Sequence, residues 1–255
     1  MNRVMRGLAA TCCLAIACVT VLALVAAVPA SALPSATTAH AAGAQAAVSA
    51  YSVPARTLRY GMKGGDVKAL QLRLAALKYY PGQADGVFGQ YTLEAVWAFQ
   101  EVQGLRVDGV IGPVTGRALV QPRGYQAHYP RGGALRVEIS LTARVLVLYQ
   151  HNNIALISHV STGGGYYYCS RGSCGWAVTP TGHFRTTVFM PGWITVPLGQ
   201  MYDPVFFIGT SYAIHGSNSV PLYPASHGCV RVPMDIAVFF HTMVKTPGTP
   251  VFIYK

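Results

Sequence analysis

Residues 135–150, LRVEISLTARVLVLYQ, decide the fold of the C-terminal half of this chain. Apolar side chains recur at every second position, first at Leu135, Val137, Ile139 and Leu141, and then at Val145 and Val147. A period of two places these side chains on one face of a strand. The sequence therefore predicts that the chain becomes β-rich from residue 135.

The pattern downstream predicts more strands and one helix. Strands are expected over residues 154–160, 205–208, 212–215 and 251–254, with a turn at 151–153. A helix is expected from Pro233 to about His241, because proline suits a first turn and Asp235 suits the positive end of a helix. These elements predict a mainly β domain over residues 135–255.

Residues 56–121 show a helical pattern instead. Apolar residues spaced by three and four recur at Val67, Leu70, Leu74 and Leu77, and again at Leu93, Val96 and Phe99. Such spacing gives each segment one apolar face. Asp66 and Thr92 are the expected N-caps of the two helices.

An internal repeat follows the form D-G-V-x-G-x-x-T. It occurs as DGVFGQYT at 85–92 and as DGVIGPVT at 108–115. Each copy is expected to turn on its glycines and to deliver a threonine to a helix start, with Asp85 and Asp108 forming the turns. We predict a small three-helix module over 56–121, joined to the β domain by a Pro/Gly-rich linker at 122–134. The fold class is therefore an α+β multidomain chain.

The N-terminus predicts export. Arg3 and Arg6 precede an apolar run that extends over about residues 8–28, and small residues follow. Residues 1–32 are interpreted as a signal peptide or an N-terminal anchor, and residues 33–55 as an Ala/Ser/Thr-rich linker. The run is long enough to span a bilayer if it is retained, and Cys18 offers a lipoprotein alternative. All three interpretations place the remaining chain outside the cytoplasm, with membrane contact only if residues 8–28 are kept.

The charge balance is strongly basic, with 19 Lys and Arg residues against 8 Asp and Glu residues. Such an excess is typical of nucleic-acid binders, but only 11% of residues are charged and the bases form no run. A polyanionic wall or membrane surface is an equally good electrostatic partner. We expect no nucleic-acid partner.

The cysteines divide into three groups. Cys12, Cys13 and Cys18 belong to the targeting segment, whereas Cys169 and Cys174 share the stretch YCSRGSCG at 168–175. A short glycine-containing turn lets this pair form a disulfide, and two free loop thiols are the alternative. Cys229 is then left over, and an unpaired cysteine in an exported protein indicates a reactive thiol or an intermolecular partner.

Cys229 lies in Ser226-His227-Gly228-Cys229-Val230-Arg231. A nucleophilic thiol needs a base, and His215 at a predicted strand end is a candidate. Gly228 allows a close backbone approach with N–H groups facing an oxyanion, and Arg231 can bind a carboxylate with two hydrogen bonds. A zinc site made by His215, His227 and Cys229 is the alternative, although no cofactor or metal is expected.

The module at 56–121 resembles the peptidoglycan-binding domain 1 family. The shared pattern contains Gly61, Gly64, Asp66, Val67, Leu70 and Gln71, then both D-G-V-x-G-x-x-T copies and the segment ending at Phe99 and Gln100. This resemblance implies that the module binds cell-wall peptidoglycan without catalysis.

Residues 135–255 resemble the L,D-transpeptidase catalytic (YkuD) family. The resemblance rests on His215-Gly216, on the SHGCVR stretch at 226–231, and on STG at 161–163 and TPTGHF at 179–184. It implies a β-sandwich in which Cys229 is the nucleophile and His215 the general base and acid. It also implies that Ser226, His227, Gly228 and Arg231 shape the pocket and that the carbonyl of Gly216 orients His215.

Two departures from the family pattern concern the loop after His215. The gap between His215 and Cys229 is shorter than in many members, and Gly216 stands where many members have serine. The resemblance still implies an exported peptidoglycan L,D-transpeptidase, a monomer, that joins stem tetrapeptides through a cysteine thioester and is inhibited by carbapenems. The alternatives are an L,D-carboxypeptidase, a wall-protein ligase, or an inactive binding protein. A low thiol pKa is expected of the enzyme, and an inert buried thiol is expected of the binding protein.

Overall fold

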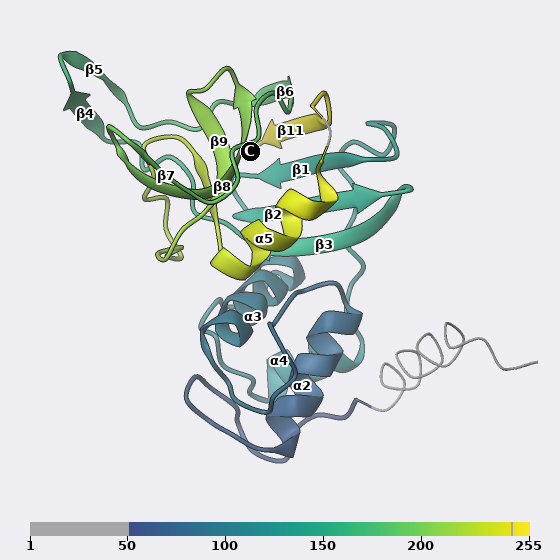
Figure 1. Cartoon of the computed structure of the whole chain (residues 1–255). Helices are drawn as coiled ribbons and strands as arrows, with labels where there is room; N and C mark the ends of the chain where they lie inside the picture. Colours follow the sequence, from purple (N-terminus) through teal and green to yellow (C-terminus); the bar gives the residue numbers. More distant parts are fainter. Residues whose placement is uncertain (1–50, 246) are drawn as a thin grey trace, which may run out of the picture.

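The computed structural model describes residues 51–245 and 247–255, so the predicted export segment and most of the following linker lie outside the described residues. The N-terminal part is helical and the C-terminal part is β-rich (Figure 1). Three helices form the first module: α2 (Gly65–Ala76), α3 (Gln90–Gln103) and α4 (Pro113–Val120). The predicted three-helix module is confirmed. No helix of the described ranges is long and apolar enough to cross a membrane.

The predicted N-caps are wrong. Gly64 and Gly89 occupy the N-cap positions of α2 and α3, and neither helix has a side-chain cap. Asp66 lies in the first turn of α2, where Arg56 donates to its carboxylate at 2.6 Å. Thr92 lies inside α3, where its hydroxyl accepts a hydrogen bond from the buried Gln71.

Each repeat wraps around a buried glutamine. The side-chain amide of Gln71 donates to the first repeat at Asp85 Oδ1, Val87 O and Thr92 Oγ1, each at 3.0 Å, and accepts from the N–H of Gly86. The amide of Gln100 makes the equivalent bonds in the second repeat, to Asp108 Oδ1, Val110 O and Thr115 Oγ1, and accepts from the N–H groups of Asp108 and Gly109. Asp85 and Asp108 also accept from the backbone two residues ahead, which confirms that they form turns.

The C-terminal domain contains two main sheets. One has the order β3-β2-β1-β11-β6, with β1 (Arg136–Ser140), β2 (Val145–Gln150), β3 (Asn153–His159), β6 (Gly182–Arg185) and β11 (Pro250–Tyr254). The other has the order β10-β9-β8-β7, with β7 (Trp193–Val196), β8 (Gly199–Ile208), β9 (Tyr212–Gly216) and β10 (Val230–Val232). Helix α5 (Met234–Met243) follows β10, and a separate hairpin, β4 (Tyr167–Ser170) with β5 (Ser173–Trp176), projects from the body (Figure 1). The strands predicted downstream of residue 153 and the predicted helix are thus present.

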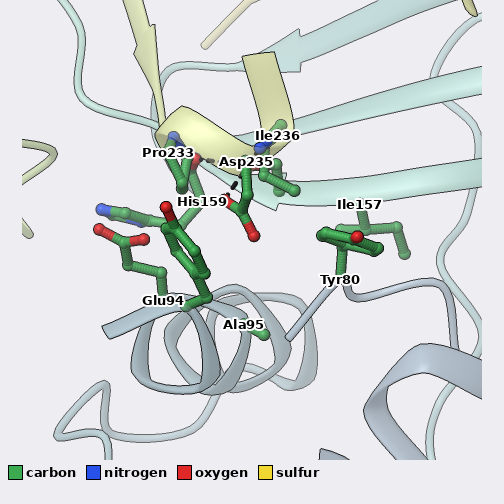
Figure 2. A pocket seen from close by; sticks show the side chains of 10 residues that line it. Tyr80, Glu94, Ala95, Ile157, His159, Pro233, Asp235 and Ile236 are labelled. Atoms are coloured by element: carbon green, nitrogen blue, oxygen red, sulfur yellow. Dashed lines mark hydrogen bonds between the residues drawn. The ribbon is translucent and has the colours of Figure 1, made fainter. Parts of the chain in front are cut away.

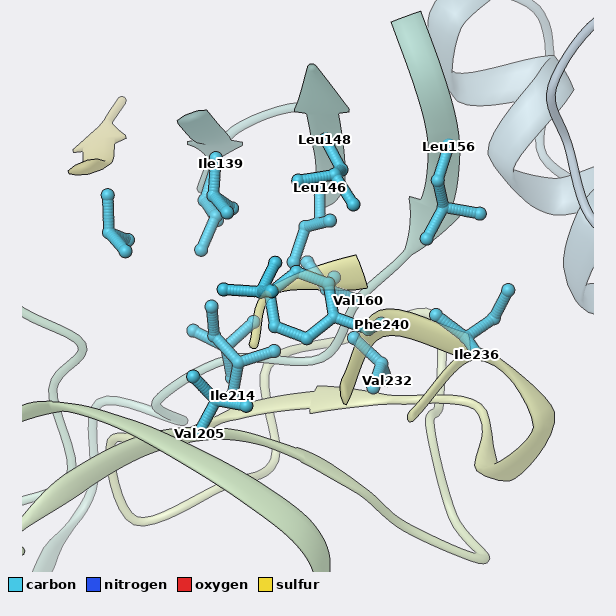
Figure 3. Packing of buried hydrophobic residues seen from close by; sticks show 14 of the residues in the cluster. Ile139, Leu146, Leu148, Leu156, Val160, Val205, Ile214, Val232, Ile236 and Phe240 are labelled. Carbon is cyan, nitrogen blue, oxygen red and sulfur yellow. The ribbon is translucent and has the colours of Figure 1, made fainter. Parts of the chain in front are cut away.

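The main core fills the space between the two sheets and α5 (Figure 3). Strands β1 and β2 of the first sheet contribute Ile139, Leu146 and Leu148, and the second sheet contributes Val205 and Ile214. All these side chains are at most 1% exposed. The alternation in residues 135–150 predicted the core position of Ile139, but Leu146 and Leu148 face this core in place of the expected Val145 and Val147.

The opposite face of the first sheet is buried as well. Val145, Val147 and Tyr149 of β2 and Ile157 of β3 belong to the same hydrophobic cluster as the core of the helical module. Strand β2 is consequently buried on both faces, and the module packs directly against the C-terminal domain. The two parts share one continuous apolar interface.

A buried carboxylate of the module reinforces this interface. Glu101 of α3 contacts His159 Nδ1 through both oxygens at 3.0 Å and Arg144 Nε at 3.3 Å. The second ring nitrogen of His159 donates to the carbonyl of Pro221, at 3.2 Å. Since Pro221 lies between His215 and Cys229, this contact links α3 to the loop that leads to Cys229.

The predicted linker at 122–134 contains no helix or strand, yet aromatic contacts hold it on β11. The hydroxyls of Tyr125 and Tyr254 are 2.7 Å apart. The ring of His128 stacks on Tyr254, and the ring of Tyr129 stacks on Phe252. The linker is therefore held on the sheet by its aromatic residues Tyr125, His128 and Tyr129.

A small cavity of about 10 Å³ lies where α3 meets α5 (Figure 2). Asp235 and Glu94 reach it from opposite sides, and each leaves one carboxylate oxygen without a hydrogen-bond partner. Burial raises the pKa of Asp235 to about 7 and also raises the pKa of Glu94. The interface therefore contains two carboxyl groups that resist ionisation.

Candidate active site

A cavity of about 630 Å³ opens between the β4–β5 hairpin and the second sheet. Five of the predicted site residues line it: His215, Ser226, His227, Cys229 and Arg231. The predicted Gly216 and Gly228 are not among its lining residues. The cavity walls also contain Arg171 and no carboxylate, so its electrostatic character is positive.

His215 lies near the end of β9, where it is buried. Its Nδ1 is 2.9 Å from the carbonyl oxygen of Gly216. A carbonyl can only accept, so Nδ1 carries the proton and Nε2 is left with its lone pair. Burial, followed by the nearby charge of Arg231, lowers the pKa of His215 to about 4. At neutral pH the ring is an uncharged base.

Close packing explains why residue 216 is a glycine. A Cβ there would come within 2.8 Å of Ala237 Cβ on α5 and 3.2 Å of Met234 Sδ. Helix α5 therefore packs directly on the backbone of β9, and a serine side chain at this position has no room. The backbone carbonyl still orients His215 without a side chain.

Strand pairing brings Cys229 to the same cavity. Strand β10 runs parallel to β9, with Val230 opposite Ile214 and Arg231 opposite His215. Cys229 immediately precedes β10, and its Sγ lies 3.9 Å from the carbonyl oxygen of Ser211. The short segment between His215 and Cys229 thus connects the end of β9 to the start of its parallel neighbour β10.

The Cys229 thiol does not show the low pKa that is expected of the enzyme as opposed to an inactive binding protein. Burial raises the pKa of Cys229, and this effect outweighs the opposing effects of the Ala213 N–H and the charge of Arg231. Cys229 and His215 are therefore a neutral thiol and a neutral imidazole that line the same cavity. The sequence motif identifies the residues but contains no information about their burial.

The SHGC loop is held by its own hydrogen bonds. The Ser226 hydroxyl donates to the carbonyl of Cys229 at 2.6 Å and accepts from the N–H of Gly228 at 3.0 Å. Gly228 has a φ of +134°, and a Cβ there would meet Tyr212 at 2.7 Å. Only glycine fits this position.

His227 and the hairpin contact each other. The ring of His227 makes edge contacts with Tyr168 and Tyr166, with centroid distances of 4.8 and 5.4 Å. These contacts join the SHGC loop, through His227, to the hairpin and the residue before it. Burial lowers the pKa of His227, with a smaller contribution from Arg231.

A disulfide joins Cys169 and Cys174, which are opposite residues of β4 and β5. Among the described residues Cys229 is the free cysteine. The same residues contain no group of three His, Cys, Asp or Glu side chains placed to bind a metal ion. Sequence reasoning did not single out Tyr168, Arg171 and Tyr212 as cavity residues, because nothing in the local pattern around them indicates which face they line.

Two family models match this chain. The L,D-transpeptidase catalytic domain (YkuD) matches residues 134–253, and a peptidoglycan binding domain matches residues 63–119. The crystal structure of the L,D-transpeptidase from Xylanimonas cellulosilytica DSM 15894 is 38% identical, with a TM-score of 0.73, and the match covers 79% of this chain and 99% of that one. The chain belongs to the L,D-transpeptidase family.

Curated relatives match this L,D-transpeptidase family member over a shorter stretch. A spore cortex-lytic enzyme of Oceanobacillus iheyensis is 39% identical over 79 residues, which is 31% of this chain and 29% of the relative. An N-acetylmuramoyl-L-alanine amidase of Mycobacterium tuberculosis is 43% identical over 75 residues, which is 28% of this chain and 18% of the relative. The chain therefore spans less than a third of the length of these relatives.

Proposed function

We propose that this protein is an exported peptidoglycan L,D-transpeptidase that works through a thioester on Cys229. The observation that carries the proposal is the shared cavity, where an uncharged His215 with a free Nε2 and the Cys229 thiol both line a positive pocket. The peptidoglycan-binding module packed against the same domain supports the choice of substrate.

The acylation step begins with a neutral pair. His215 Nε2 takes the proton of the Cys229 thiol as Sγ attacks the carbonyl carbon after the L-centre of the diamino acid in a tetrapeptide stem. The carbonyl electrons move to oxygen, and the tetrahedral intermediate then expels the terminal D-alanine. His215 returns its proton to the leaving amine, and a thioester on Cys229 remains.

The second step transfers the acyl group. An amine of a neighbouring stem attacks the thioester carbon and gives its proton to His215, which passes it to the Cys229 sulfur as the C–S bond breaks. The product is a cross-link between the third residues of two stems. Water as the acceptor makes the enzyme an L,D-carboxypeptidase, and an amine on a protein makes it a wall-protein ligase.

The positive pocket favours a substrate with free carboxylates. Arg231 is paired in register with His215 and lines the cavity, which supports a role of its guanidinium in binding a stem carboxylate. The same pocket fits covalent inhibition by carbapenems, which carry a carboxylate beside their reactive carbonyl.

Two features support export to the wall. The Cys169–Cys174 disulfide is typical of an oxidising compartment. The relatives that match part of the chain include a spore cortex-lytic enzyme and an N-acetylmuramoyl-L-alanine amidase, which supports a location at the wall. We infer an extracytoplasmic protein, membrane-bound only if residues 8–28 are retained.

Product analysis tests this proposal. Purified protein is incubated with disaccharide tetrapeptide, and the products are identified by mass spectrometry. We expect dimers linked between third residues from the wild type and none from Cys229→Ala or His215→Ala. Cross-linking by Cys229→Ala contradicts the assignment, and monomeric tripeptide as the sole product indicates the carboxypeptidase alternative.

A further inference from the structure

Thr179 lies behind the SHGC loop and is buried, with 4% of its surface exposed. Its hydroxyl donates to the carbonyl oxygen of Gly228 at 2.7 Å. The Thr179 hydroxyl oxygen also accepts a hydrogen bond from the N–H of Gly163 at 2.8 Å. The N–H of Gly163 can only donate and the carbonyl of Gly228 can only accept. The Thr179 hydroxyl must therefore accept from the first and donate to the second.

Close packing leaves this hydroxyl no alternative position. A Cβ at Gly163 would come within 2.5 Å of the Thr179 backbone N, and a Cβ at Gly228 would come within 2.9 Å of the Val178 carbonyl. Residues 177–179 are therefore enclosed between two glycines, one from STG and one from SHGC. Thr179 is the side chain that connects all three segments.

The carbonyl of Gly228 and the N–H of Cys229 belong to one peptide unit. In a trans peptide these two groups point in opposite directions. A bond that fixes the Gly228 oxygen toward Thr179 therefore fixes the Cys229 N–H away from Thr179. The Ser226 hydroxyl bonds to the N–H of Gly228 and to the carbonyl of Cys229. The N–H of Cys229 takes part in neither of these bonds nor in the bonds of Thr179.

We propose that Thr179 is a positioning residue, which fixes the Gly228–Cys229 peptide so that the Cys229 N–H binds the oxyanion formed during acylation. This inference rests on the proposed function. As Sγ adds to the substrate carbonyl, the electron pair of the C=O bond moves onto oxygen, and the Cys229 N–H donates to that oxygen. Collapse of the intermediate restores the C=O bond and breaks the bond to the leaving amine.

The test compares two reactions of the same thiol. Acylation by a carbapenem passes through an oxyanion, whereas alkylation by iodoacetamide is a direct displacement that forms none. Thr179→Val removes the hydroxyl and keeps the shape, Thr179→Ser keeps the hydroxyl, and Thr187→Val is the matched control. Thr187 also donates to a glycine carbonyl, that of Gly209 at 3.0 Å, but it is exposed and outside the cavity.

We expect Thr179→Val to slow acylation by about 100- to 1000-fold, the usual effect of losing one oxyanion donor, and to change alkylation by less than about threefold. Thr179→Ser and Thr187→Val should stay within about fivefold of wild type in both reactions. An unchanged acylation rate in Thr179→Val, or an equal loss in both reactions, overturns the inference. So does a failure of Thr179→Ser to restore acylation.

One further variant and one observation on the wild type complete the test. Thr179→Ala removes the same hydroxyl and must give the same selective loss if the valine variant does not fold. A wild-type protein that is alkylated but never acylated on Cys229 contradicts the proposed function itself. That result is distinct from a failure confined to Thr179 variants.

Discussion

Glu101→Gln tests how strongly the peptidoglycan-binding module is held on the catalytic domain. The Glu101 side chain is 1% exposed and contacts a His159 side chain that is 0% exposed. Arg144 completes the cluster at 3.3 Å. Glutamine removes the charge and directs an N–H₂ group toward one of the two donors.

The expected cost follows from the burial. Removing one partner of a buried ion pair costs about 3–5 kcal/mol, because the other charge is left unpaired. Glutamine keeps one acceptor oxygen and Arg144 is partly exposed, so we expect a loss of about 2–4 kcal/mol in the free energy of unfolding at pH 7.

Urea unfolding provides the measurement, with Glu94→Gln as the matched control. Glu94 is on the same helix, two turns earlier, and one of its carboxylate oxygens has no hydrogen-bond partner. The same substitution there should change the free energy of unfolding by less than about 1 kcal/mol, or raise it. Equal effects at both positions would refute the account of the interface.

Three other predictions follow from buried polar groups. The rate of Cys229 acylation should fall as pH drops through about 4, because His215 gains a proton there and can no longer act as a base. A pH–rate profile with a midpoint near 6.5 would contradict the burial of the His215 ring. Asp235→Asn should raise the melting temperature more at pH 8 than at pH 5, because a folded-state pKa raised to about 7 destabilises the protein as pH rises through that value. Equal shifts at both pH values would show that Asp235 ionises freely. Gln71→Leu should lower the free energy of unfolding in denaturant by about 2–4 kcal/mol, because the buried N–H of Gly86 loses its acceptor and the Thr92 hydroxyl loses the Gln71 donor. A loss below about 1 kcal/mol would contradict the role of Gln71 as the polar centre of the first repeat.

Periodicity predicted the order of elements well, because local spacing directly reflects one buried face. It failed at the helix caps. Thr92 has the residue type and position of a cap, but its hydroxyl accepts instead from Gln71, a residue 21 positions away. No local pattern shows that a buried glutamine needs that acceptor.

The candidate site, too, was predicted only in part from the sequence. The motif located His215 and Cys229, but their pKa shifts depend on burial by segments far along the chain. The alternation at Val145 and Val147 predicted a strand with one buried face, which the docked module covers, whereas the opposite face with Leu146 and Leu148 lies in the main core. Thr179 stood in a recognised motif element, yet its bond to Gly228 spans 49 positions.

Mass spectrometry of the protein after brief incubation with disaccharide tetrapeptide tests the central claim most directly. We predict an adduct equal in mass to the donor without its terminal alanine, mapped to the peptide that contains Cys229 and released by hydroxylamine, as expected of a thioester. The adduct should be absent from Cys229→Ala. An adduct on another residue, or cross-linked product formed by the Cys229→Ala variant, would contradict the account.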